Sequence, residues 1–335
     1  MFERNLMTET WNEYSRKPLH SAVLFLVLLV ISSPVFGGQE QQAVLDSLWI
    51  RASSGELKYR DLVEPSKKAL AEMSEQSIPY LVGKLDTRSA REMHTLVDIF
   101  KRIGPTAVGA LVEALSSDNH DVVRLACRCL GPIEDERATP PLLNLFFEED
   151  FRVRSEAVKA VGEIGDTIAT EEVIQMLSDS TETVRKSASV ALGKIGDRKA
   201  IKPLVTALGD EHFSVRYTAV NSLGSLSPEA NEELLRELEN LLQKKHSERL
   251  TEEESLRLCF VTQGLGEIKE KKAVGLLQEM LQVDDDWACR AFAAEALSQI
   301  GEISALSSLR QAKQSEENPF ALTKIEIAIE KLEKE

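Results

Sequence analysis

The sequence predicts an all-α fold, an α-solenoid in which about eight short helical hairpins stack on one another. Three observations support this: glycines recur at a fixed interval, an alanine precedes each of them, and apolar residues mark two helices in every unit. At 335 residues with only 5% aromatic residues, the chain exceeds the size of a typical single core, and its composition suits stacked helices with small inward side chains. We therefore expect an elongated repeat array.

The repeat is visible as three columns of residues that stay in step along the chain. The glycine column, whose members follow one another at a constant interval, is Gly131, Gly162, Gly193 and Gly224. The small-residue column, five positions before each glycine, is Ala126, Ala157, Ala188 and Ala219. An apolar column with nearly the same interval is Leu81, Leu111, Leu142, Val173 and Leu204. Columns that keep a common period are the signature of a repeat architecture.

One unit, residues 199–227, shows how each repeat is built. Ile201, Leu204 and Leu208 recur at helical spacing and predict a first amphipathic helix over residues 200–208. Gly209 ends that helix, and a second apolar series from Val215 predicts a second helix. A hairpin of this size has too little core to fold alone, so each unit must stack on its neighbours.

The chain is expected to divide into four parts. Residues 1–38 are interpreted as a signal peptide, 39–77 as an N-terminal helical cap, 78–302 as the repeat array and 303–335 as a C-terminal capping repeat. The step from Gly224 to Gly266 is clearly longer than the regular step between column glycines. The excess is a charged insertion near residues 243–254, which we expect to be either a loop on a working face or a solvated extension of the helices.

The first residues predict export. An apolar run over residues 22–31 is followed by Pro34 and the small residues Gly37 and Gly38, as in a secretory signal. The run is much shorter than a membrane span, which needs roughly 20 apolar residues. We expect a periplasmic or extracellular protein. The alternative is an uncleaved anchor, and only then would the membrane be a partner.

The second helices resemble those of a known repeat family. The string from Val184 to Asp197, VRKSASVALGKIGD, is similar to the HEAT-like repeats first associated with phycobilisome lyases, within the armadillo-like helical superfamily, and the segments starting at Val153 and Val215 match the same pattern. The resemblance implies the solenoid fold. It does not select a function, because such proteins include bilin lyases, a metal-dependent hydroxylase and many binding scaffolds.

Several kinds of chemistry are not supported by the residues. A net charge of -15 argues against nucleic acid as a partner. None of the five histidines is followed by the glutamate that the iron site of the hydroxylase relatives uses, so we expect no metal and no other cofactor. No nucleophile lies in a recognisable catalytic motif, and no catalytic residue is assigned. The cysteines Cys127, Cys129, Cys259 and Cys289 are expected to pack as small apolar residues, with disulfides as the less favoured alternative.

A column of arginines stands near the start of the second helices. Its members are Arg154, Arg185, Arg216 and Arg290, and the aspartates a turn or so earlier are Asp150, Asp179, Asp210 and Asp284. We expect each aspartate to cap a second helix or to pair with an arginine of the adjoining repeat, forming a ladder between repeats.

The exposed face of the second helices remains as the candidate binding surface. Its candidate residues are Arg124, Arg128, Lys159, Lys186, Lys194, Tyr217 and Asn221. The basic members would contact an acidic or extended protein or peptide; the alternative is an ordinary solvated helix face. The leading function is thus a non-enzymatic scaffold. The second possibility is a lyase-like auxiliary protein that holds a tetrapyrrole or similar ligand for a client.

Overall fold

A computed structural model describes residues 38–283 and 286–334 of the chain. Every regular element in these ranges is a helix, which confirms the predicted all-α class. Eight consecutive helix pairs run from α5 to α20 in the described residues, in agreement with about eight repeats. Residues 1–37 of the predicted signal peptide and Asp284 lie outside the described residues, whereas Gly38, the last residue of that prediction, begins the first described helix. No helix in the described ranges is long and apolar enough to cross a bilayer.

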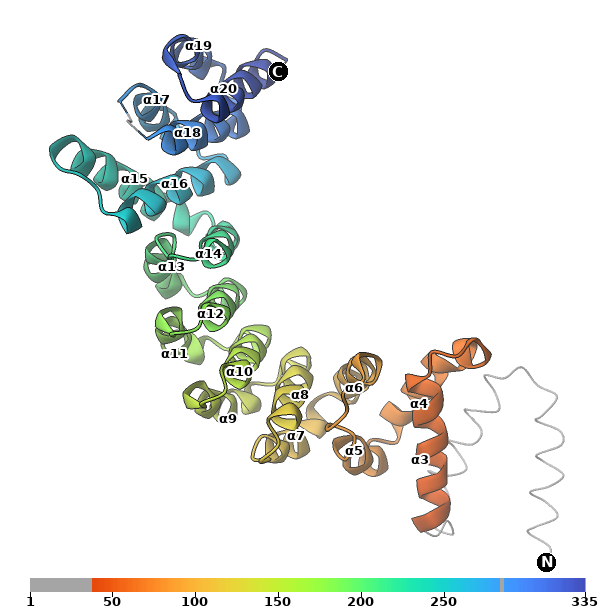
Figure 1. Cartoon of the computed structure of the whole chain (residues 1–335). Coiled ribbons are helices and arrows are strands. Elements are labelled where there is room, and N and C mark those ends of the chain that lie inside the picture. The colour runs from red at the N-terminus through yellow and green to blue at the C-terminus, as the bar shows by residue number, and fades with distance from the viewer. Residues whose placement is uncertain (1–37, 284–285, 335) are drawn as a thin grey trace, which may run out of the picture. The chain divides into compact units, whose positions relative to one another are not determined.

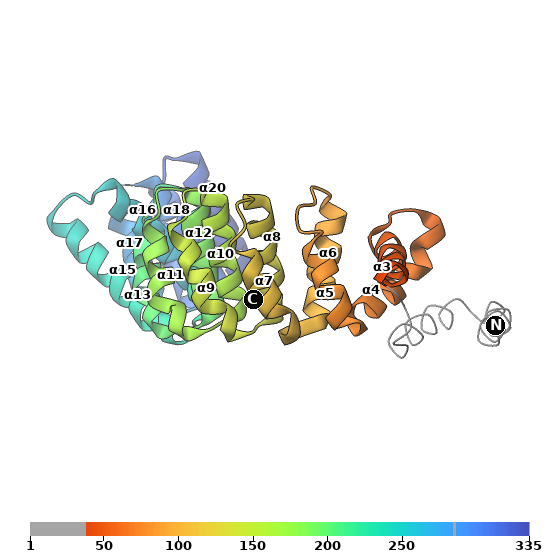
Figure 2. The ribbon, with the colours of Figure 1, turned by 90° about the horizontal axis from the view of Figure 1, so that it is seen from below.

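The chain forms two compact units, residues 1–160 and 161–335. The helices of the first are α3 (Gly38–Ser53), α4 (Val63–Glu72), α5 (Ser74–Val82), α6 (Ala90–Ile103), α7 (Val108–Ala114), α8 (His120–Leu130), α9 (Thr139–Asn144) and most of α10 (Phe151–Ile164). Within this unit α4 packs on α6 and α6 on α8, while α5 packs on α7. Figure 2 shows the paired helices α5, α6 and α7, α8 side by side.

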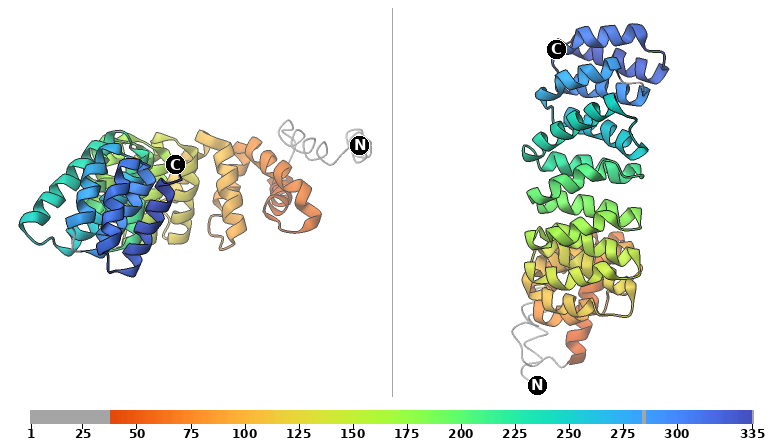
Figure 3. Two further views of the ribbon diagram at one scale, coloured as in Figure 1. Left: turned by 90° about the horizontal axis from the view of Figure 1, so that it is seen from above. Right: turned by 90° about the vertical axis from the view of Figure 1, so that its left-hand side faces the viewer.

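The second unit contains five helix pairs. Its helices are α11 (Thr170–Gln175), α12 (Glu182–Ile195), α13 (Ile201–Ala207), α14 (Phe213–Ser225), α15 (Glu229–Ser247), α16 (Glu252–Glu267), α17 (Val274–Val283), α18 (Trp287–Ile300), α19 (Leu306–Ser315) and α20 (Pro319–Leu332). The second helices α12, α14, α16, α18 and α20 form one layer, and the first helices form the other (Figure 1). The stacked hairpins of this unit follow one another in Figure 3.

The core lies between the two layers, where the predicted columns placed it. All five members of the apolar column and all four of the small-residue column are buried. The glycine column lets second helices approach closely: a Cβ added to Gly193 would lie 2.7 Å from the Cβ of Ser222 on the next second helix. All four cysteines are buried, and none forms a disulfide. The Sγ atoms of Cys259 and Cys289 lie 3.0 Å apart between α16 and α18.

The charged insertion lengthens a hairpin and does not form a long loop. Residues 243–247 continue α15, and residues 252–254 begin α16. Thr251 and Glu254 form a capping box, which fixes the start of α16. This start lies about one helical turn farther ahead of the column glycine Gly266 than the starts of α12 and α14 lie ahead of Gly193 and Gly224. The extra turn shifts the loop that precedes α16 away from its usual place in the repeat.

Candidate partner-binding surface

The residues proposed from the sequence as a binding stripe fall into two groups. In the first unit are Arg124 and Arg128 on α8 and Lys159 on α10; in the second are Lys186 and Lys194 on α12 and Tyr217 and Asn221 on α14. In the second unit all four are exposed. Because α12 packs against α14, these four belong to adjacent second helices of one layer.

Acidic neighbours reduce the positive charge of the proposed stripe. Arg124 pairs with Asp121 at 3.1 Å, and Lys159 pairs with Glu156 at 3.2 Å. In the second unit the Nζ atom of Lys194 lies 3.4 Å from a carboxylate oxygen of Glu163. Lys186 has no ion-pair partner among the described residues, so it is the exposed cation that α12 leaves unbalanced.

An aromatic cluster lies at the start of α14, where Tyr217 holds the position that Lys186 holds on the adjacent helix α12. Phe213 is 62% exposed and Tyr217, one turn later, is 45% exposed. Their rings stack with centroids 6.0 Å apart. Phe213 also makes an edge contact, at 5.9 Å between centroids, with the buried ring of Phe260 on α16. The cluster thus consists of two exposed rings, Phe213 and Tyr217, and one buried ring, Phe260, which Phe213 contacts.

Only part of this cluster was predicted from the sequence. Tyr217 was among the candidate residues, whereas Phe213 was missed. The sequence did contain a signal for Phe213. It is an aromatic residue at the first position of a second helix, whereas α12 has the charged Glu182 at the same position.

The arginine column forms the expected pair with an aspartate at one step of the second unit, and a similar pair with a glutamate at another. The guanidinium of Arg185 donates from Nε and Nη2 to the two carboxylate oxygens of Asp210, at 2.7 and 3.1 Å. Asp210 also fixes the turn that leads into α14, because its Oδ1 accepts a hydrogen bond from the backbone N–H of His212, the N-cap residue, at 2.8 Å. The expected side-chain cap of the helix by this aspartate is not formed. Arg290 makes the corresponding bidentate pair with Glu316, at 2.6 and 2.7 Å. The hydrogen bonds that Arg185 donates to Asp210 raise the pKa of the Arg185 guanidinium, and those that Arg290 donates to Glu316 lower the pKa of the Glu316 carboxyl group.

Arg216 on α14 lacks this partner, although it belongs to the same column. Its Nη1 donates to the backbone carbonyl of Asp210 at 2.5 Å, as Nη1 of Arg185 does to the carbonyl of Asp179. No carboxylate among the described residues lies at ion-pair distance, and its Nε is buried without a hydrogen bond. The expected ladder is therefore wrong at this step. The guanidinium instead lies over the ring of Phe260, with Cζ 4.8 Å from the centroid.

The long hairpin explains why Arg216 has no acid. In a regular step, the loop before the next second helix carries the aspartate to the arginine, as Asp210 reaches Arg185. Since α16 starts one turn earlier, the position that corresponds to Asp210 is held by Glu252, the first residue of that helix. The ring of Phe260, farther along α16, packs against the Arg216 guanidinium instead. Burial without a counter-charge lowers the pKa of the Arg216 guanidinium below its ordinary value.

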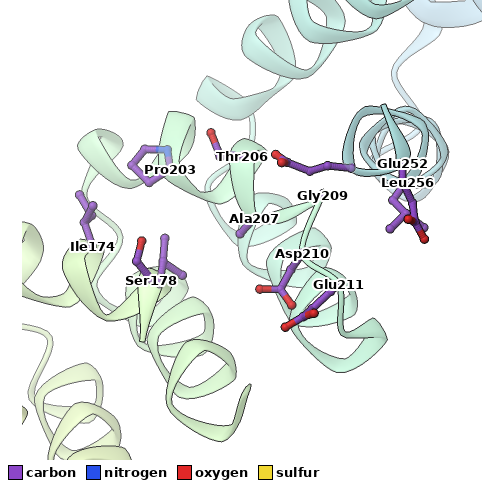
Figure 4. Close-up of a pocket in the computed structure, with 12 residues that line it drawn as sticks. Ile174, Ser178, Pro203, Thr206, Ala207, Gly209, Asp210, Glu211, Glu252 and Leu256 are labelled. Carbon is purple, nitrogen blue, oxygen red and sulfur yellow. The ribbon is translucent and has the colours of Figure 1, made fainter. Parts of the chain in front are cut away.

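A cleft of about 660 Å³ lies on the side of the first helices. Ile174 and Pro203 line one side of it, and Glu252 and Leu256 of α16 approach from the other (Figure 4). Its acidic residues are Asp210, Glu211, Glu252 and Glu253. Asp210 is already engaged by Arg185, so the cleft offers an acidic wall and no charged donor group.

The described ranges contain no cluster of three or more histidine, cysteine, aspartate or glutamate side chains arranged to hold a metal ion. The four histidines in these ranges lie on separate helices or loops, and three of them lie at ion-pair distance from carboxylates: His120 from Asp150 at 3.3 Å, His246 from Glu279 at 2.8 Å, and His212 from Glu211 at 3.3 Å.

Comparison with known proteins identifies the class of this chain. A model of HEAT repeats matches residues 108–190, 170–257 and 254–330, so the matches run without a gap from 108 to 330 and cover about two thirds of the chain. The chain therefore belongs to the HEAT-repeat family. None of the curated proteins compared with it matches.

Solved structures with a similar fold include proteins of several kinds. The chain is similar to Kap95p, in a complex with RanGDP, with 15% identity and a TM-score of 0.50 over 98% of this chain and 52% of that protein. YibA of E. coli has 18% identity and a TM-score of 0.47, covering 80% of this chain and 96% of YibA. The CpcE and CpcF complex of phycocyanin lyase from Nostoc sp. PCC7120 has 18% identity and a TM-score of 0.37, covering 76% and 94%. Identities this low show the fold alone.

Proposed function

We propose that this HEAT-repeat chain is a non-enzymatic scaffold that binds a protein or peptide on the exposed face of its second helices. The observation that carries the proposal is the exposed Phe213 and Tyr217 pair, which stands on the buried Phe260 ring. Aromatic side chains that are held in place at a surface supply much of the binding energy of protein interfaces. Because the two rings already pack on one another, binding orders few additional rotamers.

The surroundings of this pair suit an interface. Lys186 lies exposed on the adjacent helix α12 and Asn221 lies exposed one turn beyond Tyr217, so polar groups border the rings. A polar rim around an apolar centre is the usual anatomy of a protein interface. The buried Arg216 beneath the rings adds a third residue type that interfaces favour.

Site-specific photo-crosslinking tests the proposed surface. A photoreactive phenylalanine analogue at Tyr217 should crosslink the partner, while the same analogue at Lys202, exposed on α13 in the layer of first helices, should not. Phe213→Ala should remove the crosslink at Tyr217 without unfolding the chain, because the ring is mostly exposed. Equal crosslinking from both positions, or from neither, would contradict the assignment of this face.

We also propose that the chain is exported, since residues 22–31 form an apolar run of signal-peptide length ahead of Pro34 and Gly37. N-terminal sequencing of the protein recovered from the periplasm or medium is the test. A start near residue 38 would support export with cleavage. Retention in the cytoplasm with an intact N-terminus would overturn the proposal.

A further inference from the structure

The unpaired Arg216 is the feature of this surface that the repeat architecture does not account for. Arg185 on α12 and Arg290 on α18, its counterparts in the column, each donate two hydrogen bonds to a carboxylate, from Nε and Nη2. Arg216 is 8% exposed, and a charge enclosed to that extent is costly unless it is paired. The Arg216 guanidinium is therefore buried as in a paired arginine of the column, but it has no carboxylate partner among the described residues.

Part of the fork remains open to a ligand. Nη1 is used by the carbonyl of Asp210, and Nε is buried without a partner. Nη2 makes no hydrogen bond with the described residues and is not among the enclosed nitrogens. Phe213, whose ring centroid lies 6.0 Å from the Arg216 Cζ, and Tyr217 stand next to this opening.

We infer that Arg216, Phe213 and Tyr217 form a notch that takes one carboxylate of the partner, from a glutamate or aspartate that stands next to an apolar residue. The inference rests on the proposed scaffold function and names the chemistry of its partner. The carboxylate accepts a hydrogen bond from Nη2, the one nitrogen of this guanidinium that is neither bonded to the described residues nor enclosed. The neighbouring apolar side chain of the partner packs on the two exposed rings.

The physical basis is charge complementarity at a partly desolvated site. A charge-assisted hydrogen bond is stronger than a neutral one, and its strength increases where water is excluded. The Phe260 ring under the guanidinium supplies a cation–π contact but no negative group for its donors. An amide of the same shape as the partner's acid would form the hydrogen bond without neutralising the charge, so acid and amide should be distinguished.

Two short peptides and three variants test the notch. The peptides have capped ends and differ only at the central residue, which lies between two phenylalanines and is glutamate in one peptide and glutamine in the other. Phe213→Glu places an acid one turn before Arg216 on the same helix, where it can occupy the fork. Glu182 occupies the same position at the start of α12, so the fold tolerates this residue there. Phe213→Leu is the matched control, and Arg216→Met removes the charge.

Binding of each peptide is measured by calorimetry with the full chain. The native chain should bind the glutamate peptide about tenfold more tightly than the glutamine peptide. Phe213→Leu should weaken both and retain the preference. Phe213→Glu and Arg216→Met should abolish the preference.

Equal binding of the two peptides by the native chain, or a preference that survives in Phe213→Glu, would overturn the inference. No binding of either peptide at millimolar concentration would overturn it as well. The crosslink from Tyr217 is independent of these results, so it shows whether the scaffold function fails together with the carboxylate notch or stands without it.

Discussion

Two consecutive interfaces between second helices of the second unit, α12 with α14 and α14 with α16, differ in packing and in ion pairing. We call each such interface a step, and a step is closed where its column arginine is paired with a carboxylate. At the first, Gly193 is pressed against Ser222, and Arg185 holds Asp210. At the second, a Cβ added to Gly224 would have no neighbour within 4 Å, and Arg216 has no carboxylate among the described residues. The glycine column and the arginine column therefore both lack their usual neighbours at the interface of α14 with α16.

The difference shows what regular spacing contributes. A regular step brings the column glycine against the next helix and a carboxylate to the column arginine. The α14 to α16 step instead contains a longer hairpin, which extends past its neighbours (Figure 2). The residues added between Gly224 and Gly266 lengthen α15 and α16. Groups that bind one another in a regular step are left available in the irregular one. We therefore place the partner site where the repeat departs from its period.

The largest expected effect separates the two arginines. Arg185→Met should cost about 3 kcal/mol of unfolding free energy, because it leaves the largely buried Asp210 without its counter-charge. Arg216→Met should cost about 1 kcal/mol, since it removes a cation–π contact and one hydrogen bond and strands no carboxylate. Urea unfolding of both variants measures the difference. Equal losses would show that Arg216 has a partner equivalent to Asp210.

The column glycines should respond in opposite directions. Gly193→Ala should destabilise by about 2 kcal/mol, because the new methyl group would overlap the Ser222 side chain and Cα across the α12 and α14 interface. Thermal or urea unfolding measures the effect. A neutral result would mean that α12 and α14 separate more easily than their packing indicates.

Acid should weaken the closed step at Arg290, because a protonated Glu316 no longer forms an ion pair with the guanidinium. Arg290 lowers the pKa of Glu316 in the folded chain below its ordinary value of 4.5. The pair therefore stabilises the fold fully above the unfolded pKa, and this contribution is lost as the pH falls from about 4.5 through the lower folded value. Glu316→Gln should lack this part of the pH dependence of stability. A variant with the unchanged acid profile of the native chain would contradict the assignment.

The smallest expected effect is a gain at the open step. Gly224→Ala should stabilise by about 0.5 kcal/mol, because alanine is the better helix former and nothing lies where its methyl group would point. The same unfolding measurement compares it with Gly193→Ala. A loss at Gly224 would place an unrecognised neighbour against this part of α14.

The sequence was sufficient for the regular steps and insufficient for the irregular one. The regular columns predicted the buried positions and the pairing of Arg185 with Asp210, because each step copies the one before it. The partner of Arg290 is Glu316, which the aspartate column did not include. The gap at Arg216 depends on where α16 begins, and the length of an insertion alone does not say whether it forms a loop or extends a helix. The proximity of Cys259 and Cys289 was not predicted either.

The most direct test of the open step is the NMR signal of the arginine side chains. Nε–Hε resonances of Arg185, Arg216 and Arg290 are assigned in the native chain and followed while the glutamate peptide is added. We expect the Arg216 resonance to shift and those of Arg185 and Arg290, whose Nε atoms are already bonded to carboxylates, to stay in place. A shift at all three arginines, or an Arg216 signal that does not respond, would contradict the account.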